Sequence, residues 1–354
     1  MKKIILTGGG TAGHVTPNIA LLPSLRAAGY EVSYIGSYQG IERSMIEEAK
    51  IPYYPISSGK LRRYFDIKNF TDPFRVLKGY AQARHLMSKL SPDVIFSKGG
   101  FVSVPVVLAA SSAHIPVIIH ESDMTPGLAN RIAMKGATKI CCNFPETLRY
   151  LPADKAVLTG SPIRSELLQG DKSAAMSFLG FSDEKPVMMI MGGSIGSVFI
   201  NNAVRQSLDI LLKDFSIVHL CGKGNLDFEY DNIDGYRQFE FISDELPDLF
   251  AASDIVISRA GANSICELLA LRKPNILIPL SKNASRGDQI LNARSFERQG
   301  FSMVLEEESV TAASLVAAVN DVFSNRDAYV RKMEKSPMGD SIAVIIELIS
   351  EVSL

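Results

Sequence analysis

A glycine-rich loop with a histidine at its end is the first stretch of this sequence that can do chemistry. The segment LTGGGTAGHVTPN (residues 6–18) places Gly8, Gly10 and Gly13 directly after a short apolar run, and His14 follows them. A strand, a glycine-rich turn and a helix form a cradle for phosphate, because glycine lets the backbone approach closely and the helix N-terminus offers oriented N–H groups. The same spacing also fits a tight strand-to-helix turn that binds nothing.

A dinucleotide is one ligand that this loop suggests. Such a site needs an acidic residue about 20 residues beyond the glycines, at the end of the second strand, where it binds ribose hydroxyls. The strand predicted near 31–36 instead runs into Ser37, and the nearest acids are Glu31, at the wrong end of that strand, and Glu42, in the next helix. The first loop is therefore not expected to bind NAD or FAD.

Two further glycine loops follow predicted strands. Gly99 and Gly100 come after the strand near 93–97, and the segment GGSIGS (192–197) comes after the strand near 187–191. Ligands of parallel α/β sheets bind at the carboxyl ends of the strands. All three loops are therefore expected to line one crevice.

A nucleotide-like pattern lies in the second half, in the segment SRAGANSICE (258–267). It predicts a helix that begins near Gly261 and directs its first amides at an anion, with Glu267 one to two turns further on. A carboxylate at that place can accept both hydroxyls of a ribose, although a solvent-exposed glutamate is the plainer alternative. Asp288 and Gln289 add a polar helix start after a later strand.

The elements that must position these loops are repeated β–α units. Parallel sheets with helices on both faces are expected, in two similar halves separated by the Gly160-Ser161-Pro162 turn. The domains predicted are 1–162 and 163–339, with 340–354 as a lone amphipathic helix. Long helices are predicted at Val15–Ala28 and Val198–Leu212. The predicted strands lie near 3–7, 31–36, 53–57, 93–97, 116–120, 138–142, 156–159, 187–191, 215–221, 236–241, 254–258, 275–279 and 302–305.

Composition limits the class of protein. The chain has 354 residues and a net charge of −1, so it suits two domains and is not an electrostatic nucleic-acid binder. Its four cysteines show no metal-ligand spacing, and no Asp-x-Asp pattern follows a strand, so no metal or other cofactor is expected. No secretory signal or spanning apolar stretch is evident, which predicts a cytosolic protein unless it attaches to a surface.

The order of the motifs resembles the MurG family, the bacterial transferases that convert lipid I to lipid II in peptidoglycan synthesis. The matching segments are GGGTAGHVTPN, KGGFVSVP, HESDMTPGLANR, GSPIR, GGSIGS, SRAGANSICELLALRKPNILIP and DQILNA. The resemblance implies a GT-B glycosyltransferase fold, with two Rossmann-like domains facing across a cleft. It also implies that the C-terminal helix crosses back onto the first domain.

By this resemblance the second domain holds UDP-N-acetylglucosamine. Glu267 is then expected at the ribose, the backbone near Ile242 at the uracil, and Gln289, with Asp288 beside it, at the sugar hydroxyls. Arg164, Ser194 and the helix start would hold the diphosphate. Across the cleft, three loop residues and Asn130 would approach the donor sugar. The helix start comprises Ala262, Asn263 and Ser264, and the three loop residues are Thr11, Ala12 and Gly13.

The first domain is implied to bind the acceptor, an undecaprenyl-diphosphate-linked N-acetylmuramoyl-pentapeptide. Its C4 hydroxyl would attack the anomeric carbon of the donor in one inverting displacement. His14 is the first candidate for the base, and Glu121 is expected to orient it or to be the base itself, with Asn130 beside them. The glycines implied for the acceptor diphosphate are Gly9, Gly10, Gly13, Gly99 and Gly100.

Three departures from other members of the family stand in these motifs. Phe101 takes the place of a tyrosine, and its ring brings no hydroxyl to the reaction. Ser122 and Asp123 replace Gln-Asn after the His-Glu pair, and Asn263 and Ser264 replace Leu-Thr. They are interpreted as variation within the family.

A basic segment with apolar residues suggests contact with an anionic membrane. Between residues 60 and 89, eight Lys or Arg stand against two acids. Phe70, Phe74 and Leu77 have helical spacing and face either the core or lipid, but the segment as a whole favours the membrane. A peripheral protein on the cytoplasmic face of the plasma membrane is expected. The predicted patch comprises Lys60, Arg62, Arg63, Phe70, Phe74, Arg75, Leu77 and Lys78.

Other classes remain open at this point. An oxidoreductase with a dinucleotide in the first domain is one, although the missing acid disfavours it. A GT-B enzyme acting on diacylglycerol and a UDP-N-acetylglucosamine epimerase are nearer alternatives. A binding protein without catalysis is the least favoured, because both halves carry polar groups at strand ends.

Overall fold

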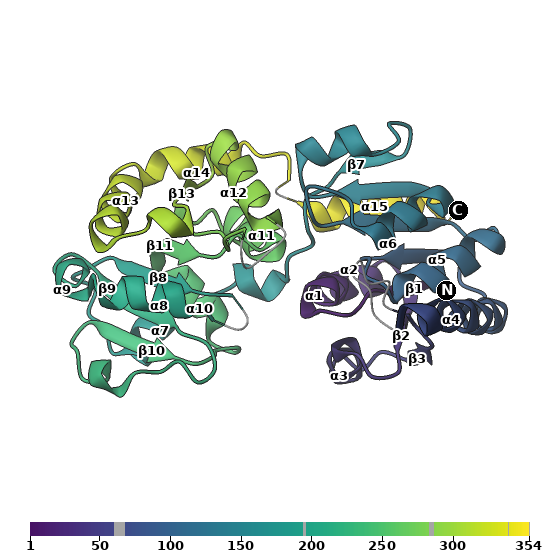
Figure 1. The fold of residues 1–354 in the computed structure, drawn as a ribbon, viewed down its shortest axis with the longest axis horizontal. Helices are drawn as coiled ribbons and strands as arrows, with labels where there is room; N and C mark the ends of the chain where they lie inside the picture. Colours follow the sequence, from purple (N-terminus) through teal and green to yellow (C-terminus); the bar gives the residue numbers. More distant parts are fainter. Residues whose placement is uncertain (60–67, 194–195, 283–286, 339, 354) are drawn as a thin grey trace. The chain divides into compact units, whose positions relative to one another are not determined.

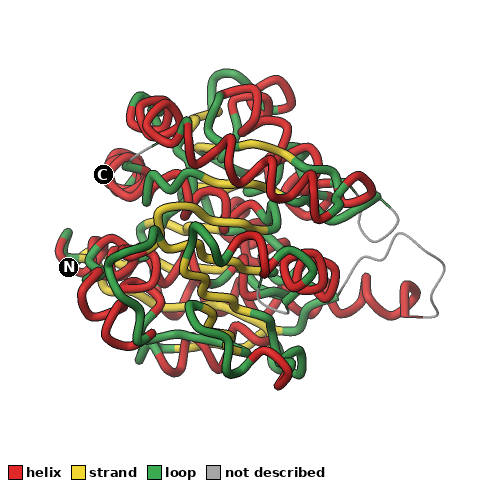
Figure 2. The backbone as a smooth tube through the Cα atoms, turned by 90° about the vertical axis from the view of Figure 1, so that its left-hand side faces the viewer, coloured by secondary structure: helices red, strands yellow, loops and turns green. Residues whose placement is uncertain are grey.

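Short buried strands alternate with helices along the computed structural model (Figure 1). The structure describes residues 1–59, 68–193, 196–282, 287–338 and 340–353, without the side chains of 68–71. The chain divides into two units, Met1–Arg164 with Asp340–Leu354, and Ser165–Gly339. Within them, helices flank the strands (Figure 2).

The first unit is built on a parallel sheet. Among the described residues it has seven strands, in the order β3-β2-β1-β4-β5-β6-β7. The order reverses between β1 and β4, so the loops after these two neighbours lie at the same edge, which is where such sheets bind ligands. The strands are β1 (Lys2–Thr7), β2 (Tyr30–Ser37), β3 (Tyr53–Ile56), β4 (Val94–Ser97), β5 (Val117–Glu121), β6 (Lys139–Cys142) and β7 (Ala156–Leu158).

Alternate residues of these strands build two cores. Ile4 and Leu6 of β1 pack on one face with α1, α2 and α3, whereas Ile5 packs on the other face with α4, α5 and α6. Because successive side chains of a strand point to opposite faces, a strand covered on both sides must be apolar throughout. The helices are α1 (Thr16–Ala20), α2 (Leu22–Ala27), α3 (Ile41–Glu48), α4 (Lys68–Leu90), α5 (Ser103–Ser112) and α6 (Leu128–Ala133).

The last helix, α15 (Ser341–Val352), belongs to the first unit although it follows the second in the chain (Figure 1). Ile345 and Ile349 are fully buried in the core that contains Ile4 and Leu6. Ser341 Oγ donates to the carbonyl of Ser161 at 2.6 Å. The isolated amphipathic segment thus buries its apolar face against the first sheet.

The second unit repeats the plan. Its described residues form six parallel strands in the order β10-β9-β8-β11-β12-β13. The strands are β8 (Val187–Met191), β9 (Ser216–Leu220), β10 (Tyr236–Phe239), β11 (Ser253–Ser258), β12 (Asn275–Leu277) and β13 (Met303–Val304). The helices are α7 (Lys172–Leu179), α8 (Val198–Arg205), α9 (Leu208–Leu211), α10 (Leu246–Ala252), α11 (Ala262–Ala270), α12 (Asp288–Gln299), α13 (Ala312–Ser324) and α14 (Arg326–Glu334).

The predictions of two long continuous helices are wrong, because each predicted helix is divided into two in the structure. The first is divided into α1 and α2, and each piece carries a proline, Pro17 or Pro23, in its first turn, where the missing N–H costs no hydrogen bond. The second is divided into α8 and α9 at Ser207, whose Oγ donates to the carbonyl of Ala203 at 2.9 Å. A serine that bonds back to the preceding turn bends a helix.

Replacement of Ile345 by alanine is expected to destabilise the chain by about 2–4 kcal/mol, because it leaves a cavity in a core shared by α15 and the first sheet. Denaturant unfolding measures this loss. Glu347→Ala changes an exposed position of the same helix and is expected to have little effect. Equal effects of the two changes would contradict the packing of α15 described above.

Candidate active site

The loops after β1 and β4 approach each other so closely that only glycine fits between them. Gly10, Gly99 and Gly100 have φ values of 90°, 88° and 81°, which residues with a side chain rarely adopt. A Cβ on Gly100 would overlap the carbonyl oxygen of Gly9 and would lie 3.3 Å from Cδ2 of His14. The two glycine loops predicted in the first half are thus brought together.

His14 lies at the junction of these loops, at the end of a short 3-10 helix (Ala12–His14). Its Nδ1 is 3.2 Å from the carbonyl oxygen of Lys98. A carbonyl only accepts, so Nδ1 carries the hydrogen and Nε2 is left as an acceptor. Burial, followed by the nearby Lys98 ammonium, lowers the pKa of His14 to about 4. The ring is therefore neutral near pH 7 and can take a proton at Nε2.

Glu121, at the end of β5, is buried and does not orient His14 as predicted. Its Oε1 accepts from the amide of Asp123 at 3.0 Å, and its Oε2 accepts from the amide of Gly127 at 3.1 Å and from Nδ2 of Asn130 at 2.9 Å. Burial raises the pKa of Glu121 to about 7, against the hydrogen bonds from these groups. The carboxylate shapes the loop that leads into α6, and the Lys98 carbonyl orients His14.

Asn130, in α6, packs against the second glycine loop. A Cβ on Gly99 would lie 2.9 Å from Asn130 Oδ1. This oxygen is buried and has no hydrogen-bond partner among the residues that the structure describes. A buried acceptor without a partner is costly, and a ligand hydroxyl or amide would satisfy it.

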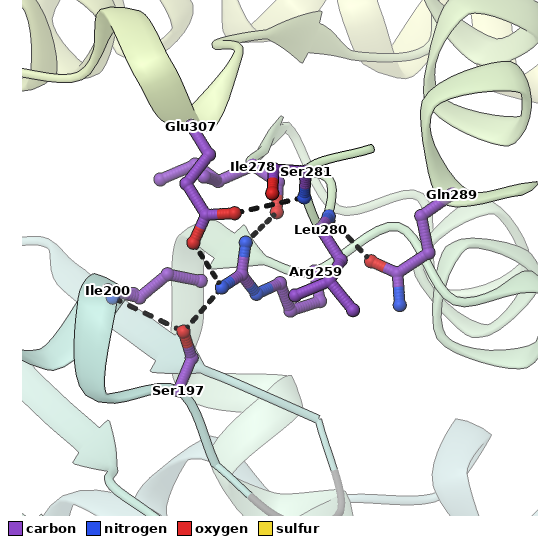
Figure 3. Close-up of polar contacts among 8 residues, drawn as sticks. All are labelled: Ser197, Ile200, Arg259, Ile278, Leu280, Ser281, Gln289 and Glu307. Carbon is purple, nitrogen blue, oxygen red and sulfur yellow. Dashed lines mark hydrogen bonds and ion pairs between the residues drawn. The ribbon is translucent and has the colours of Figure 1, made fainter. Parts of the chain in front are cut away.

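A cavity of about 450 Å³ lies at the carboxyl ends of the central strands of the second unit. Glycines of the third loop, Ser264 at the start of α11 and Gln289 at the start of α12 line it. Gly261 is the N-cap of α11, so the first amides of this helix are directed outward, as the sequence predicts. Gln289 Oε1 accepts from the amide of Leu280 at 3.0 Å, and its amide nitrogen is the group that can donate to a ligand (Figure 3).

Arg259 holds the loops that line this cavity together, a role that was not predicted from the sequence (Figure 3). The residue is buried directly after β11, and Nη2 lies 2.7 Å from Ser197 Oγ and 2.8 Å from Glu307 Oε1. Ser197 in turn caps α8 by accepting from the amide of Ile200 at 3.3 Å, and Glu307 Oε2 accepts from the amide of Ser281 at 3.0 Å. One guanidinium, placed after β11, therefore ties together the loops after β8 and β13, and Glu307 extends the link to the loop after β12.

The other residues predicted at the donor are placed as follows. Ala262, Asn263 and Ser264 form the first turn of α11, and Glu267 follows one turn later on the same, partly exposed side. Asp288 is the first residue of α12. Ile242 is buried in the loop after β10, and Ser194 lies outside the described residues.

Arg164 is the last residue of the first unit, whereas the turn at 160–162 predicts that it belongs to the second. It lines a cavity of about 360 Å³ with Thr16, Glu48 and neighbouring apolar residues. Thr11, Ala12 and Gly13 lie beside His14, and their approach to a donor bound on the other unit stays a prediction.

The basic segment reaches the surface on α4. Phe74 and Leu77 are 75% and 66% exposed, so the interpretation that they face the core is wrong. Arg75 and Lys78 are exposed beside them, and Arg75 lies 3.7 Å from Asp72. No helix in the described part of the chain is long and apolar enough to cross a membrane. Four predicted patch positions lie outside the described residues or side chains: Lys60, Arg62, Arg63 and Phe70.

Two parallel-sheet units with glycine loops at their carboxyl edges are the architecture of the GT-B class of glycosyltransferases, and the family comparison assigns the chain to that class. Residues 4–142 match the glycosyltransferase family 28 N-terminal domain, and residues 187–349 match the glycosyltransferase family 28 C-terminal domain. The chain belongs to this family.

Relatives match the whole chain. Proteins named UDP-N-acetylglucosamine–N-acetylmuramyl-(pentapeptide) pyrophosphoryl-undecaprenol N-acetylglucosamine transferase share 66% identity in Lachnospira eligens and 62% in Lachnoclostridium phytofermentans, and each match covers 100% of both chains. A crystal structure of Acinetobacter baumannii MurG has a TM-score of 0.78 at 24% identity and covers 99% of this chain and 100% of its own. This last likeness concerns the fold.

Three residues to which no role in the site was assigned from the sequence complete the first-unit site. Lys98 and His120 are fully buried below the glycine loops, with Lys98 Nζ 2.7 Å from His120 Nδ1. Glu42 reaches back to the first loop and accepts from the amide of Gly10 at 3.2 Å. One signal in the sequence could have indicated Lys98. The lysine stands between a buried strand and two glycines, a place where a charged side chain is unusual.

Replacement of Gly100 by alanine is expected to lower turnover more than tenfold, because the new Cβ must push the first loop, which carries Gly9 and His14, away from the loop after β4. Gly127→Ala is the matched control, since Gly127 has φ −65° and open space around its Cα. Steady-state rates and unfolding curves of both variants check this. Normal turnover by Gly100→Ala would contradict the close approach of the loops.

Proposed function

We propose that the chain transfers N-acetylglucosamine from UDP-N-acetylglucosamine to the C4 hydroxyl of the N-acetylmuramoyl unit of an undecaprenyl-diphosphate-linked pentapeptide. The observation that carries the proposal is the 66% identity, over the whole of both chains, to a transferase named for these substrates. The product is the disaccharide lipid from which peptidoglycan is built. The two sites supply the chemistry that this reaction needs.

The donor is assigned to the second-unit cavity. Helix α11 directs its first amides at the diphosphate, where a helix N-terminus stabilises negative charge. Glu267 accepts the ribose hydroxyls from its place one turn further on, and the Gln289 amide donates to the sugar. Arg259 holds the loops around this cavity in place, so its effect on donor affinity is indirect.

The acceptor is assigned to the loops after β1 and β4 in the first unit. Their glycines let backbone N–H groups approach the acceptor diphosphate. Oδ1 of Asn130, which has no hydrogen-bond partner among the described residues, is available to a hydroxyl or amide of a sugar. His14 Nε2 is then the proton acceptor beside the reacting hydroxyl.

The reaction is one displacement. The C4 oxygen attacks the anomeric carbon as the bond from that carbon to the UDP oxygen breaks, and the hydroxyl proton passes to His14 Nε2. A bound acceptor diphosphate adds negative charge near His14, which raises its pKa and makes it a better base in the complex. Glu121, the other candidate base, accepts at both carboxylate oxygens, from two amides of the loop that follows it and from Asn130 of α6.

No metal or other cofactor is assigned to the reaction. The helix start of α11 and an arginine supply the positive charge that a leaving diphosphate needs. Arg164 stays a candidate for that arginine, and its contact with a donor held on the other unit is part of the proposal.

The surface formed by Phe74, Arg75, Leu77 and Lys78 is assigned to the membrane. Exposed apolar side chains beside basic ones suit an anionic lipid surface, where each charge contributes about 1 kcal/mol. The acceptor carries a polyprenyl chain, so attachment there brings the first-unit site to its substrate. The cytoplasmic face is proposed because nucleotide-sugar donors are made in the cytoplasm.

Transfer of labelled N-acetylglucosamine to a soluble lipid I analogue tests this function. Glu267→Ala is expected to weaken donor binding about tenfold or more through lost hydrogen bonds, with a smaller effect on turnover. His14→Ala is expected to lower turnover by about 10²–10⁴ while UDP affinity is retained. Addition of EDTA is expected to leave the wild-type rate unchanged.

The outcomes separate the alternatives. Epimerisation or hydrolysis of the donor without transfer to the lipid analogue would favour another member of the fold. Tight binding of NAD(H) without binding of UDP would indicate an oxidoreductase. Wild-type turnover by His14→Ala would exclude His14 as the base.

Vesicle sedimentation tests the membrane surface. The double variant Phe74→Ser, Leu77→Ser is expected to lose about tenfold or more of its binding to phosphatidylglycerol vesicles, because it removes the apolar part of the patch. Phe228→Ser is the control, since Phe228 is 77% exposed on the second unit. Equal binding by the double variant and the wild type would place the membrane contact elsewhere.

A further inference from the structure

Two oppositely charged side chains that the proposed reaction does not use are buried beside the His14 loop. Lys98 and Glu42 both have no solvent-exposed surface. Charged groups are rarely kept at such depth, because burial costs their hydration. Glu42 holds the loop that carries His14, and Lys98 belongs to the neighbouring loop whose carbonyl bonds the His14 ring.

We propose that Lys98 and Glu42 are positioning residues that together fix the ring orientation, the tautomer and the charge of His14 for proton transfer. The proposal rests on the function proposed above, because the role of His14 as base gives the pair its purpose. It assigns no contact between either side chain and the substrate.

The Lys98 segment fixes the ring. Its carbonyl accepts from His14 Nδ1, while its Nζ lies 2.7 Å from His120 Nδ1 and 3.4 Å from Ser161 Oγ. His120 is fixed in turn, because its Nε2 lies 2.8 Å from the carbonyl of Gly160 and must donate to it. His120 Nδ1 is then an acceptor for the ammonium group. The lysine side chain thereby anchors the backbone that orients His14.

The Glu42 carboxylate fixes the other segment. Its Oε2 accepts from the amide of Gly10, and its Oε1 accepts from the amide and the hydroxyl of Ser37 at 3.1 and 2.5 Å. A Cβ on Gly9 would lie 2.7 Å from the carboxylate, so this glycine makes room for the acid. The first loop is therefore held to the end of β2 through a buried anion.

The two charges act on the His14 proton in opposite directions. Lys98, from the loop after β4, lowers the pKa of His14 in addition to the larger effect of burial. Glu42, from α3, raises it, as does the hydrogen bond to the Lys98 carbonyl. Removal of one charge should therefore move the titration of His14 up, and removal of the other should move it down. A role in packing alone would not produce opposite shifts.

The test is a pH titration of the full chain labelled with ¹⁵N-histidine, observed by NMR. The His14 signals are identified by their loss in His14→Gln. In the wild type the ring is expected to stay neutral, with hydrogen on Nδ1, down to about pH 5. Lys98→Met is expected to raise the midpoint by about one pH unit or more, and Glu42→Gln is expected to lower it.

Matched controls remove equal charges from the surface of the same unit. Lys2→Met and Glu48→Gln change exposed residues, and water screens their charges, so the midpoint should not move. Lys98→Gln repeats the test if Lys98→Met does not fold, because glutamine keeps N–H donors in the buried site without a charge.

Two results would overturn the proposal: shifts in the same direction, or a wild-type His14 with hydrogen on Nε2. The titration needs no turnover, so it is independent of the transfer assay. Opposite shifts in a chain that transfers no sugar would support the positioning of His14 and reject the proposed function. Active transfer with a His14 midpoint that is the same in Lys98→Met, Glu42→Gln and the wild type would support the proposed function and reject the positioning role.

Discussion

The close approach of the loops after β1 and β4 is the constraint on which the first site depends. The register of these neighbouring parallel strands brings both loops to one edge, and the space left between them excludes a Cβ at Gly100. That proximity lets a backbone carbonyl of one loop orient His14 on the other. The tautomer of His14 and its lowered pKa follow from this geometry and from the burial that it causes.

In the second unit, a side chain holds the loops at the strand ends together. Four loops at the strand ends are tied together by the Arg259 guanidinium. It lies after β11 and bonds Ser197 after β8, the carbonyl of Ile278 after β12 and Glu307 after β13. The donors of a guanidinium lie in one plane at fixed angles to one another. A buried arginine with a carboxylate partner therefore fixes the positions of the loops that it bonds. Both units thus place their polar groups in the loops and helix starts that follow buried parallel strands.

The sequence patterns predicted the strands and the glycine loops correctly. They did not predict which side chains from distant segments would contact one another. Every predicted strand is present, because a strand covered on both faces is a continuous apolar run that periodicity detects. Helix breaks at Leu21 and Ser207 were missed, since one depends on proline position and the other on a side chain that bonds backward. Lys98, Glu42, Arg259 and Glu307 were missed because their partners lie in distant segments that only the fold brings together.

The central claim is a single displacement at the anomeric carbon with His14 as the base. The configuration of the new bond tests it most directly. Proton NMR of the disaccharide formed from the α-linked donor and a soluble acceptor reports that configuration through the coupling of the anomeric proton. One displacement inverts the carbon and predicts a β linkage. An α-linked product would require a second displacement and would contradict the mechanism.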